Sequence, residues 1–133
     1  QGRTWVDLGI VLGQNNGLDN SGAWSPSAIV RDKEIWLHYH NNPYKCVDTM
    51  CSTEEYQGSE LYRTRLQGNG WQLIKTEKLR GPGGGPIRDV SNVDVQYAFG
   101  KYWLIGEKFI YMGEGTHNQS SIVFYISAAG LNY

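Results

Sequence analysis

The sequence predicts an all-β protein built from a repeated antiparallel sheet, and three observations support this prediction. The chain of 133 residues is 40% hydrophobic and 13% aromatic, with 17 glycines and only 19% charged residues, which is typical of strands joined by many turns. No segment shows a helical period over the ~11 residues that a helix assignment needs. Segments of the first half return in the second half at a nearly constant interval, as they do in propellers and other repeat arrays.

The repeat is clearest at Trp36 and Trp103, which lie 67 residues apart. The apolar strand before each tryptophan and the aromatic-rich strand around it recur at the same interval. A Gly-x-x-aromatic turn then closes each copy. We therefore expect one repeat over about 24–80 and a second over about 90–133.

Alternating apolar residues, bounded by turn residues, place the strands. The first strand is expected at 3–12, where alternation is mixed with β-branched residues. The later strands are expected at 27–30, 35–39, 61–65, 71–78, 93–97, 102–107 and 122–127.

The connections between these strands have distinct compositions. Residues 31–34 are charged and suit an exposed hairpin turn, and Asn69-Gly70 is a strong signal for a second one. Residues 41–59 have no usable period and are expected to form a long loop. Residues 81–86, rich in glycine and proline, are expected to form a flexible connector.

This strand order predicts a β-propeller with two four-stranded blades per chain. The second repeat has only three strands, and a strand equivalent to 3–12 is expected to complete its blade as the outermost strand. In a ring of several copies, that strand can come from another chain. Two blades cannot close a ring, since propellers use about four to eight. The ring is expected to be completed by oligomerisation, as a homodimer or homotrimer, or by blades that this sequence lacks. Oligomerisation is the favoured expectation, because the chain begins and ends at equivalent points of the repeat.

Charge and hydropathy limit the expected partners. The formal net charge is -1 and no stripe of Lys and Arg is visible, which argues against nucleic acid. No run approaches the ~18 apolar residues of a membrane span, and no signal-like segment opens the chain, so no membrane partner is expected. The compartment is unknown from the sequence, with a secreted or periplasmic one favoured.

The two cysteines and their neighbouring histidines allow few metal sites. Cys46 and Cys51 either form a disulfide in an oxidising compartment or remain thiols in a reducing one. A zinc site would need two further ligands, and the only close histidines, His38 and His40, are better explained as polar residues of one strand. No metal and no other cofactor is expected.

Both repeats share one pattern of residues. Residues 24–30 run Trp-Ser-Pro-Ser into an apolar strand, and a turn leads to the aromatic-rich strand 35–39. This pattern resembles the inner two strands of a blade in the five-bladed β-propeller glycoside hydrolases of the arabinanase and xylosidase type (family 43 and its relatives), where it runs Trp-Ala-Pro-Asp. Residues 91–104 and 127–133 look like the same blade again. The resemblance covers most of the chain and lies in residues of the blade framework.

The resemblance implies a carbohydrate site in the central funnel of the ring. In those enzymes carboxylates on innermost strands act as general base and as tuning residue, and a glutamate is the general acid. Asp94 aligns with the inner-strand acid and could be the base or the tuning residue, while Glu107 could be the acid. Ser27 stands at the matching place of the first repeat, where the carboxylate is missing.

Other candidate residues have both a binding and a structural interpretation. Trp24 is a candidate stacking platform, and Arg88 with Asp89 is a candidate substrate-binding pair in which Asp89 binds a sugar hydroxyl or pairs with Arg88. In the structural interpretation Asp94 caps a turn, Glu107 is a solvated strand end, and Arg88 and Asp89 form a surface ion pair.

Two functions follow from these expectations. The first is a glycoside hydrolase-like protein that acts on or binds a glycan in the central funnel. The alternative is a non-catalytic sugar-binding or structural propeller module that assembles as a homo-oligomer, with Trp24, Tyr44 and Tyr56 as stacking platforms. Whether the protein is an enzyme, and which sugar and linkage it takes, are left open by the sequence.

Overall fold

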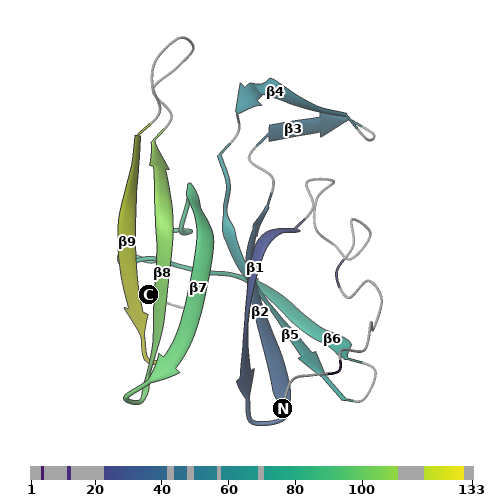
Figure 1. The fold of residues 1–133 in the computed structure, drawn as a ribbon, viewed down its shortest axis with the longest axis vertical. Coiled ribbons are helices and arrows are strands. Elements are labelled where there is room, and N and C mark those ends of the chain that lie inside the picture. The colour runs from purple at the N-terminus through teal and green to yellow at the C-terminus, as the bar shows by residue number, and fades with distance from the viewer. Residues whose placement is uncertain are drawn as a thin grey trace.

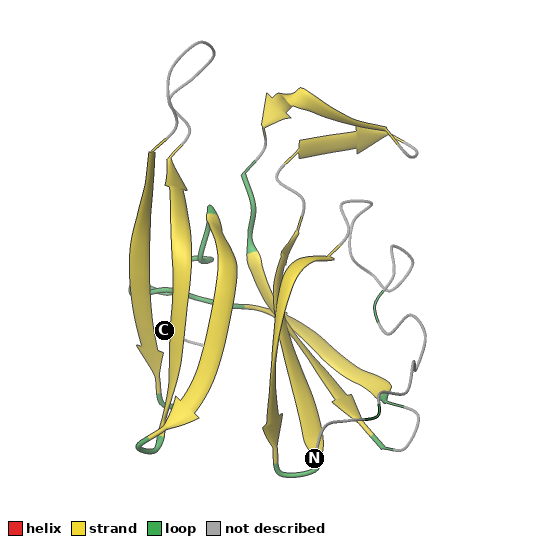
Figure 2. Cartoon of the chain, in the orientation of Figure 1, coloured by secondary structure: helices red, strands yellow, loops and turns green. Residues whose placement is uncertain are grey.

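The computed structural model describes residues 4, 12, 23–41, 44–47, 50–56, 58–68, 71–110 and 119–130. These residues form strands, turns and loops without any helix, so the predicted all-β class is confirmed (Figures 1 and 2). It follows that the described part holds no helix of the length and apolarity needed to cross a bilayer. The expected strand at 3–12 lies outside the described residues, apart from Thr4 and Leu12, so its place in a blade stays a prediction.

The strands of the first repeat form a four-stranded antiparallel sheet in the order β1-β2-β5-β6. A tight turn at Asp32 and Lys33 joins β1 to β2, and Asp32 there has a φ of 55°, which aspartate tolerates better than most residues. The sequence predicted these four strands, each within a few residues of its observed bounds. The strands are β1 Ala23–Arg31, β2 Glu34–Asn41, β5 Leu61–Gln67 and β6 Gln72–Lys78.

The segment 41–59, which was predicted to be a loop, contains a separate two-stranded hairpin. Its strands are β3 Tyr44–Val47 and β4 Met50–Tyr56, and they pair antiparallel with Cys46 opposite Cys51. The prediction was wrong because it searched for an apolar period. A two-stranded ladder needs only pairing between two backbones, and an alternating apolar face appears where a sheet covers a core.

The second repeat forms a three-stranded antiparallel sheet in the order β7-β8-β9. Its strands are β7 Val90–Ala98, β8 Lys101–Ile110 and β9 Gln119–Ser127. All three contain the strands expected from the sequence.

The two sheets pack through one face of each, and β1 lies beside β7 (Figure 1). Ile29 of β1 meets the buried valines and aromatic residues of the second sheet in a single core. The segment between β6 and β7 adds Leu79 and Ile87 to that core. The fully and nearly fully buried members are Ile29, Leu61, Leu79, Ile87, Val90, Val93, Val95, Tyr102 and Leu104. This core holds the two sheets together, and polar side chains of β1 and β7 come into contact beside it.

Candidate functional site

Equivalent positions of the two repeats are hydrogen-bonded to each other where β1 runs beside β7. Ser27 Oγ donates to Asp94 Oδ1 over 3.0 Å, and Ser25 Oγ donates to Asn92 Oδ1 over 3.2 Å. Each pair is separated by 67 residues in the sequence. The interval of the sequence repeat is therefore also the interval between side chains that touch in the fold.

A matching backbone irregularity sets up these contacts. The ladder of β1 is irregular between Trp24 and Ser27, and that of β7 is irregular between Ser91 and Asp94, 67 residues later. Inside each bulge one polar residue has a positive φ, 49° at Ser25 and 48° at Asn92. Bulges re-aim side chains, and such backbone strain in non-glycine residues concentrates at functional sites.

The hydrogen bonds continue from β7 to β8. Asn92 Nδ2 donates to Glu107 Oε2 over 3.0 Å. Gln96 Nε2 lies 3.4 Å from Asp94 Oδ1 and 3.3 Å from Asp94 Oδ2, both long hydrogen bonds. These bonds form two neighbouring sets, Ser25–Asn92–Glu107 and Ser27–Asp94–Gln96. We call their six residues together the polar row.

The polar row includes both carboxylates that were candidates for catalysis, Asp94 and Glu107. Asp94 pairs with Ile105 in the ladder, and Glu107 lies two residues further along β8 on the same face of the sheet. Asp94 lies within β7 and does not cap a turn, so the structural interpretation was wrong for this residue.

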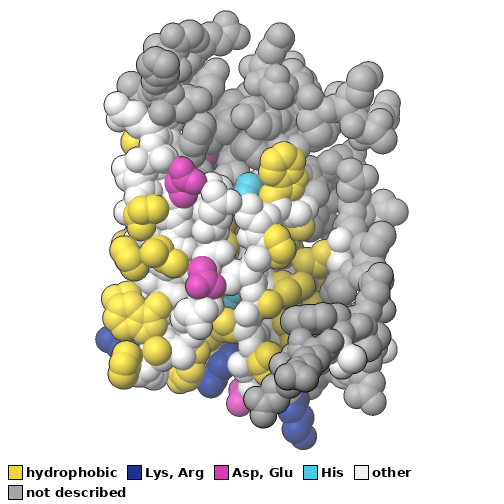
Figure 3. Space-filling model, in the orientation of Figure 1, with side chains coloured by type: hydrophobic (Ala, Val, Ile, Leu, Met, Phe, Trp, Pro, Cys, Tyr) yellow, Lys and Arg dark blue, Asp and Glu magenta, His cyan; other side chains and the backbone are white. Residues whose placement is uncertain are grey.

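Trp24 borders the polar row, next to Ser25 in the chain. Its side chain is 48% exposed and its ring lies 6.2 Å from that of His40, its ladder partner. A large exposed aromatic ring beside carboxylate, amide and hydroxyl groups offers both an apolar surface and hydrogen-bonding groups to one ligand. Figure 3 shows acidic side chains over β7 on this side of the molecule, with a histidine close by toward β1.

The other two predicted substrate-binding residues attach a loop to the start of β7. Arg88 forms an ion pair with Glu60 at 2.9 Å, and its side chain is otherwise exposed. Asp89 Oδ1 accepts a 3.2 Å hydrogen bond from Ser59 N, and Asp89 N donates to Ser59 O. Both residues thus have structural contacts with the segment 58–60.

His38 is buried beside the polar row, opposite Ser27 on one side and Arg63 on the other. Burial, together with the nearby Arg63 charge, lowers the pKa of His38 to about 3, so its ring is neutral at pH 7. Neither ring nitrogen has a hydrogen-bond partner among the described residues. Within the same ranges, no three His, Cys, Asp or Glu side chains gather as a metal site requires.

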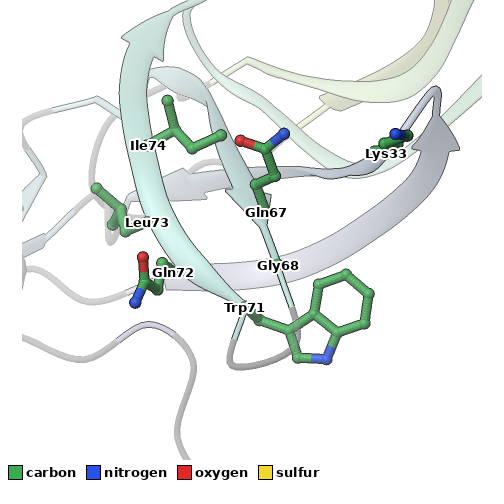
Figure 4. A pocket seen from close by; sticks show the side chains of 7 residues that line it. All are labelled: Lys33, Gln67, Gly68, Trp71, Gln72, Leu73 and Ile74. Carbon is green, nitrogen blue, oxygen red and sulfur yellow. The ribbon is translucent and has the colours of Figure 1, made fainter.

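A separate hollow of about 490 Å³ lies at the other end of the first sheet, near its two hairpin turns (Figure 4). Trp71 and Lys33 line it together with Gln67 and Gln72. No carboxylate is among its described lining residues, so it lacks the groups for acid–base hydrolysis. We therefore take the polar row as the candidate site.

Sequence reasoning named Asp94 and Glu107, which lie in the polar row, and Trp24, which borders it, but did not name Ser25, Asn92 or Gln96. The signal that could have found the first bulge is Pro26, since proline inside a strand marks a bulge or an edge. Comparison of the chain with family models, curated proteins and solved structures finds no match. Function is therefore inferred from the geometry of the polar row and from the residues of the two repeats.

Proposed function

We propose that this protein binds carbohydrate along the polar row, with Trp24 as its stacking platform, as part of a β-propeller of the kind its blades resemble. The observation that carries the proposal is the contact of Ser27 with Asp94 beside an exposed tryptophan. Sugars present hydroxyl groups together with apolar patches of C–H groups, and the polar row and the indole ring are complementary to both.

Asp94 is the central acceptor of the proposed site. Its Oδ1 atom already accepts from Ser27 at 3.0 Å, while Oδ2 accepts only a long 3.3 Å bond from Gln96 among the described residues. A carboxylate oxygen has capacity for further donors, and a bond from a hydroxyl group to it is charge-assisted. A sugar hydroxyl would take this position, with the ring lying toward Trp24.

Titration with xylo- and arabino-oligosaccharides, followed by calorimetry or NMR, tests the proposal. Asp94→Ala and Trp24→Ala are each expected to weaken binding by about tenfold or more, the loss of one charged hydrogen bond or one stacking contact. Phe99→Asp is the matched control, because Phe99 is 94% exposed in the β7–β8 turn and outside the polar row. Equal binding by all three variants, or no binding by the unmodified protein, would contradict the proposal.

Hydrolysis is the second candidate, favoured by the diagonal placement of Asp94 and Glu107 on one face. An inverting pair needs two carboxyl groups on either side of the scissile bond, and these two project from the same face of the second sheet. Asp94 would act as general base and Glu107 as general acid. Binding alone ranks first because Ser27 replaces the carboxylate in the first repeat. Turnover of aryl xylosides or arabinofuranosides that is abolished by Asp94→Asn and by Glu107→Gln would favour hydrolysis, and binding without turnover would exclude it.

A further inference from the structure

The first sheet packs on the second through a face that we call its front face. Trp36 on this face stacks on Tyr102 of β8, with ring centroids 5.1 Å apart and planes inclined by 14°. Arg31 donates to the hydroxyl of Tyr102 over 3.0 Å and lies 4.0 Å from the ring centroid of Tyr97. Arg63 donates to the carbonyl oxygen of Gly130 over 2.9 Å. The front face therefore contacts the second sheet along β7, along β8 and just beyond β9.

The second sheet has a corresponding front face, which is uncovered. Ladder partners lie on the same face of a sheet, so Trp36 and its partner Arg65 both lie on the front face of the first sheet. The residue equivalent to Trp36 in the second repeat is Trp103, and its partner in β9 is Ile126. Trp103 and Ile126 therefore mark the front face of the second sheet. Trp103 is 36% exposed and Phe124 is 69% exposed. We call the exposed apolar residues of this face the open face: Trp103, Ile105, Ile122, Phe124 and Ile126.

The first sheet carries on its other side the surface that such a face would pack against. Within the chain, Tyr97 contacts Arg31 and Tyr102 contacts Trp36. The equivalent positions of the first repeat, 67 residues earlier, are occupied by Val30 and Ile35. Val30 is 75% exposed and Ile35 is half-buried. The ladder continues this apolar row across the sheet, and we call it the back row: Val30, Ile35, Leu66 and Leu73. Val30 and Leu73 are exposed, whereas Leu66, only 2% exposed, is already buried within the chain.

We propose that the open face of one copy packs on the back row of a second copy and so repeats between chains the interface found within the chain. The expected partner is a second copy of this chain. Its back row lies at the first-repeat positions equivalent to Tyr97 and Tyr102, the residues that contact the front face within the chain. A contiguous exposed apolar patch such as the open face is uncommon on monomers and marks an interaction site. Contacts of this head-to-tail type are heterologous, and they form a closed ring when the rotation between copies closes.

The assembly also extends the candidate site. Asp94 on the second sheet is the equivalent of Ser27 on the first. Within the chain these two equivalent residues are hydrogen-bonded to each other. When the interface repeats between copies, Ser27 and Asp94 alternate around the centre of the ring. The proposed interface does not depend on sugar binding, so either proposal can fail alone.

Light scattering of the purified protein tests the association. We expect a mass that is a multiple of 15.0 kDa, and a fall to 15.0 kDa in Trp103→Arg and in Phe124→Arg. Phe99→Asp, which removes an exposed aromatic group from a turn outside the open face, is expected to leave the mass unchanged. Circular dichroism of each variant confirms that its strands are retained. A mass of 15.0 kDa for the unmodified protein at every concentration would overturn the proposal.

Cross-linking tests which faces meet. Arg31 lies against Tyr97 within the chain, and the corresponding pair between copies is Ala98 with Val30 of the neighbour. In a background with serine at both native cysteine positions, Ala98→Cys and Val30→Cys proteins are mixed and treated with a short bismaleimide. A cross-linked dimer in the mixture, and in neither protein alone, is expected. A dimer formed by Ile126→Cys alone would show that two open faces meet, and would overturn the head-to-tail arrangement.

Discussion

Ser27 donates a hydrogen bond of 3.0 Å to Asp94, the residue that holds its own position in the second repeat. The same hydroxyl accepts a bond of 3.1 Å from the backbone N–H of Val95. The Ser27 side chain thus links the first sheet to both a side chain and a backbone N–H of the second sheet. Serine in the first repeat and aspartate in the second are complementary at this contact, whereas two carboxylates there would repel each other.

Ser27→Ala is expected to destabilise the protein by about 1–3 kcal/mol, because Val95 is buried and its N–H would lose a partner. Urea unfolding of the variant measures the loss. Ser25→Ala removes one exposed hydrogen bond to Asn92 and serves as the control, with an expected cost of about 1 kcal/mol or less. Equal effects of the two substitutions would show that Ser27 does not connect the sheets in the way described.

Acid is expected to destabilise the fold partly through His38. Burial lowers its pKa to about 3, so between pH 6.5 and 3 the unfolded chain binds a proton that the folded chain does not. The free energy of unfolding therefore falls as pH drops through this window. The contribution of His38 to it is largest above pH 6.5. Burial also lowers the pKa of His40, which adds to the same trend.

His38→Ile is the matched variant for this pH dependence, since the second repeat carries Ile105 at the equivalent position. Its unfolding free energy, measured by urea titration from pH 7 to pH 4.5, is expected to depend less steeply on pH than that of the unmodified protein. Parallel pH profiles would rule out His38 as a source of acid sensitivity.

Gly130 is expected to tolerate no side chain. A Cβ atom there would lie 3.0 Å from the Tyr102 ring and 3.1 Å from Trp36, and φ is +69°. Gly130→Ala is expected to cost about 2–4 kcal/mol, from backbone strain of about 1 kcal/mol and overpacking of about 1–3 kcal/mol. Gly100→Ala, with a φ of +73° and nothing within 4 Å of its Cβ, isolates the strain. Thermal unfolding compares them, and similar losses would contradict the packing contribution.

The ionised Glu34 carboxylate is expected to stabilise the front face at pH values above the ordinary pKa of a glutamate. Bonds from Arg65 at 2.7 and 2.8 Å, and from Trp36 at 2.8 Å, lower its pKa to about 2. This stability is present above pH 4.5 and is lost as pH falls toward 2. Glu34→Gln is expected to cost about 1 kcal/mol at pH 7, in urea unfolding, and clearly less at pH 2.5. A cost that does not change with pH would contradict this role.

Cys46 and Cys51 are expected to form a disulfide under oxidising conditions. They are direct ladder partners in the β3–β4 hairpin, where paired Cα atoms lie about 4.5–5.5 Å apart, a separation that a disulfide can bridge. Alkylation under denaturing conditions followed by mass spectrometry measures it: label is expected only after reduction. Label on both cysteines of the air-exposed protein without reduction would refute the pairing.

Local pattern was sufficient to locate most strands. Alternation and turn residues predicted all four strands of the first sheet and all three of the second, because strand burial has a period of two that is written directly in the chain. Asp94 became a candidate through the resemblance of the repeat to the enzyme blade. The β3–β4 hairpin escaped prediction because it has no alternating pattern along its length.

The sequence by itself determined the all-β class, the interval of 67 residues and the identity of the carboxylates at the candidate site. Only the tertiary structure decided that Ser25 and Asn92 lie in matching bulges, that Arg88 pairs with Glu60, and that the open face stays bare. The reason is physical: strand formation follows from neighbours along the chain, whereas contacts between sheets depend on how two backbones bend and pack when they meet. Those contacts join residues that are distant in the sequence, so no local pattern specifies them.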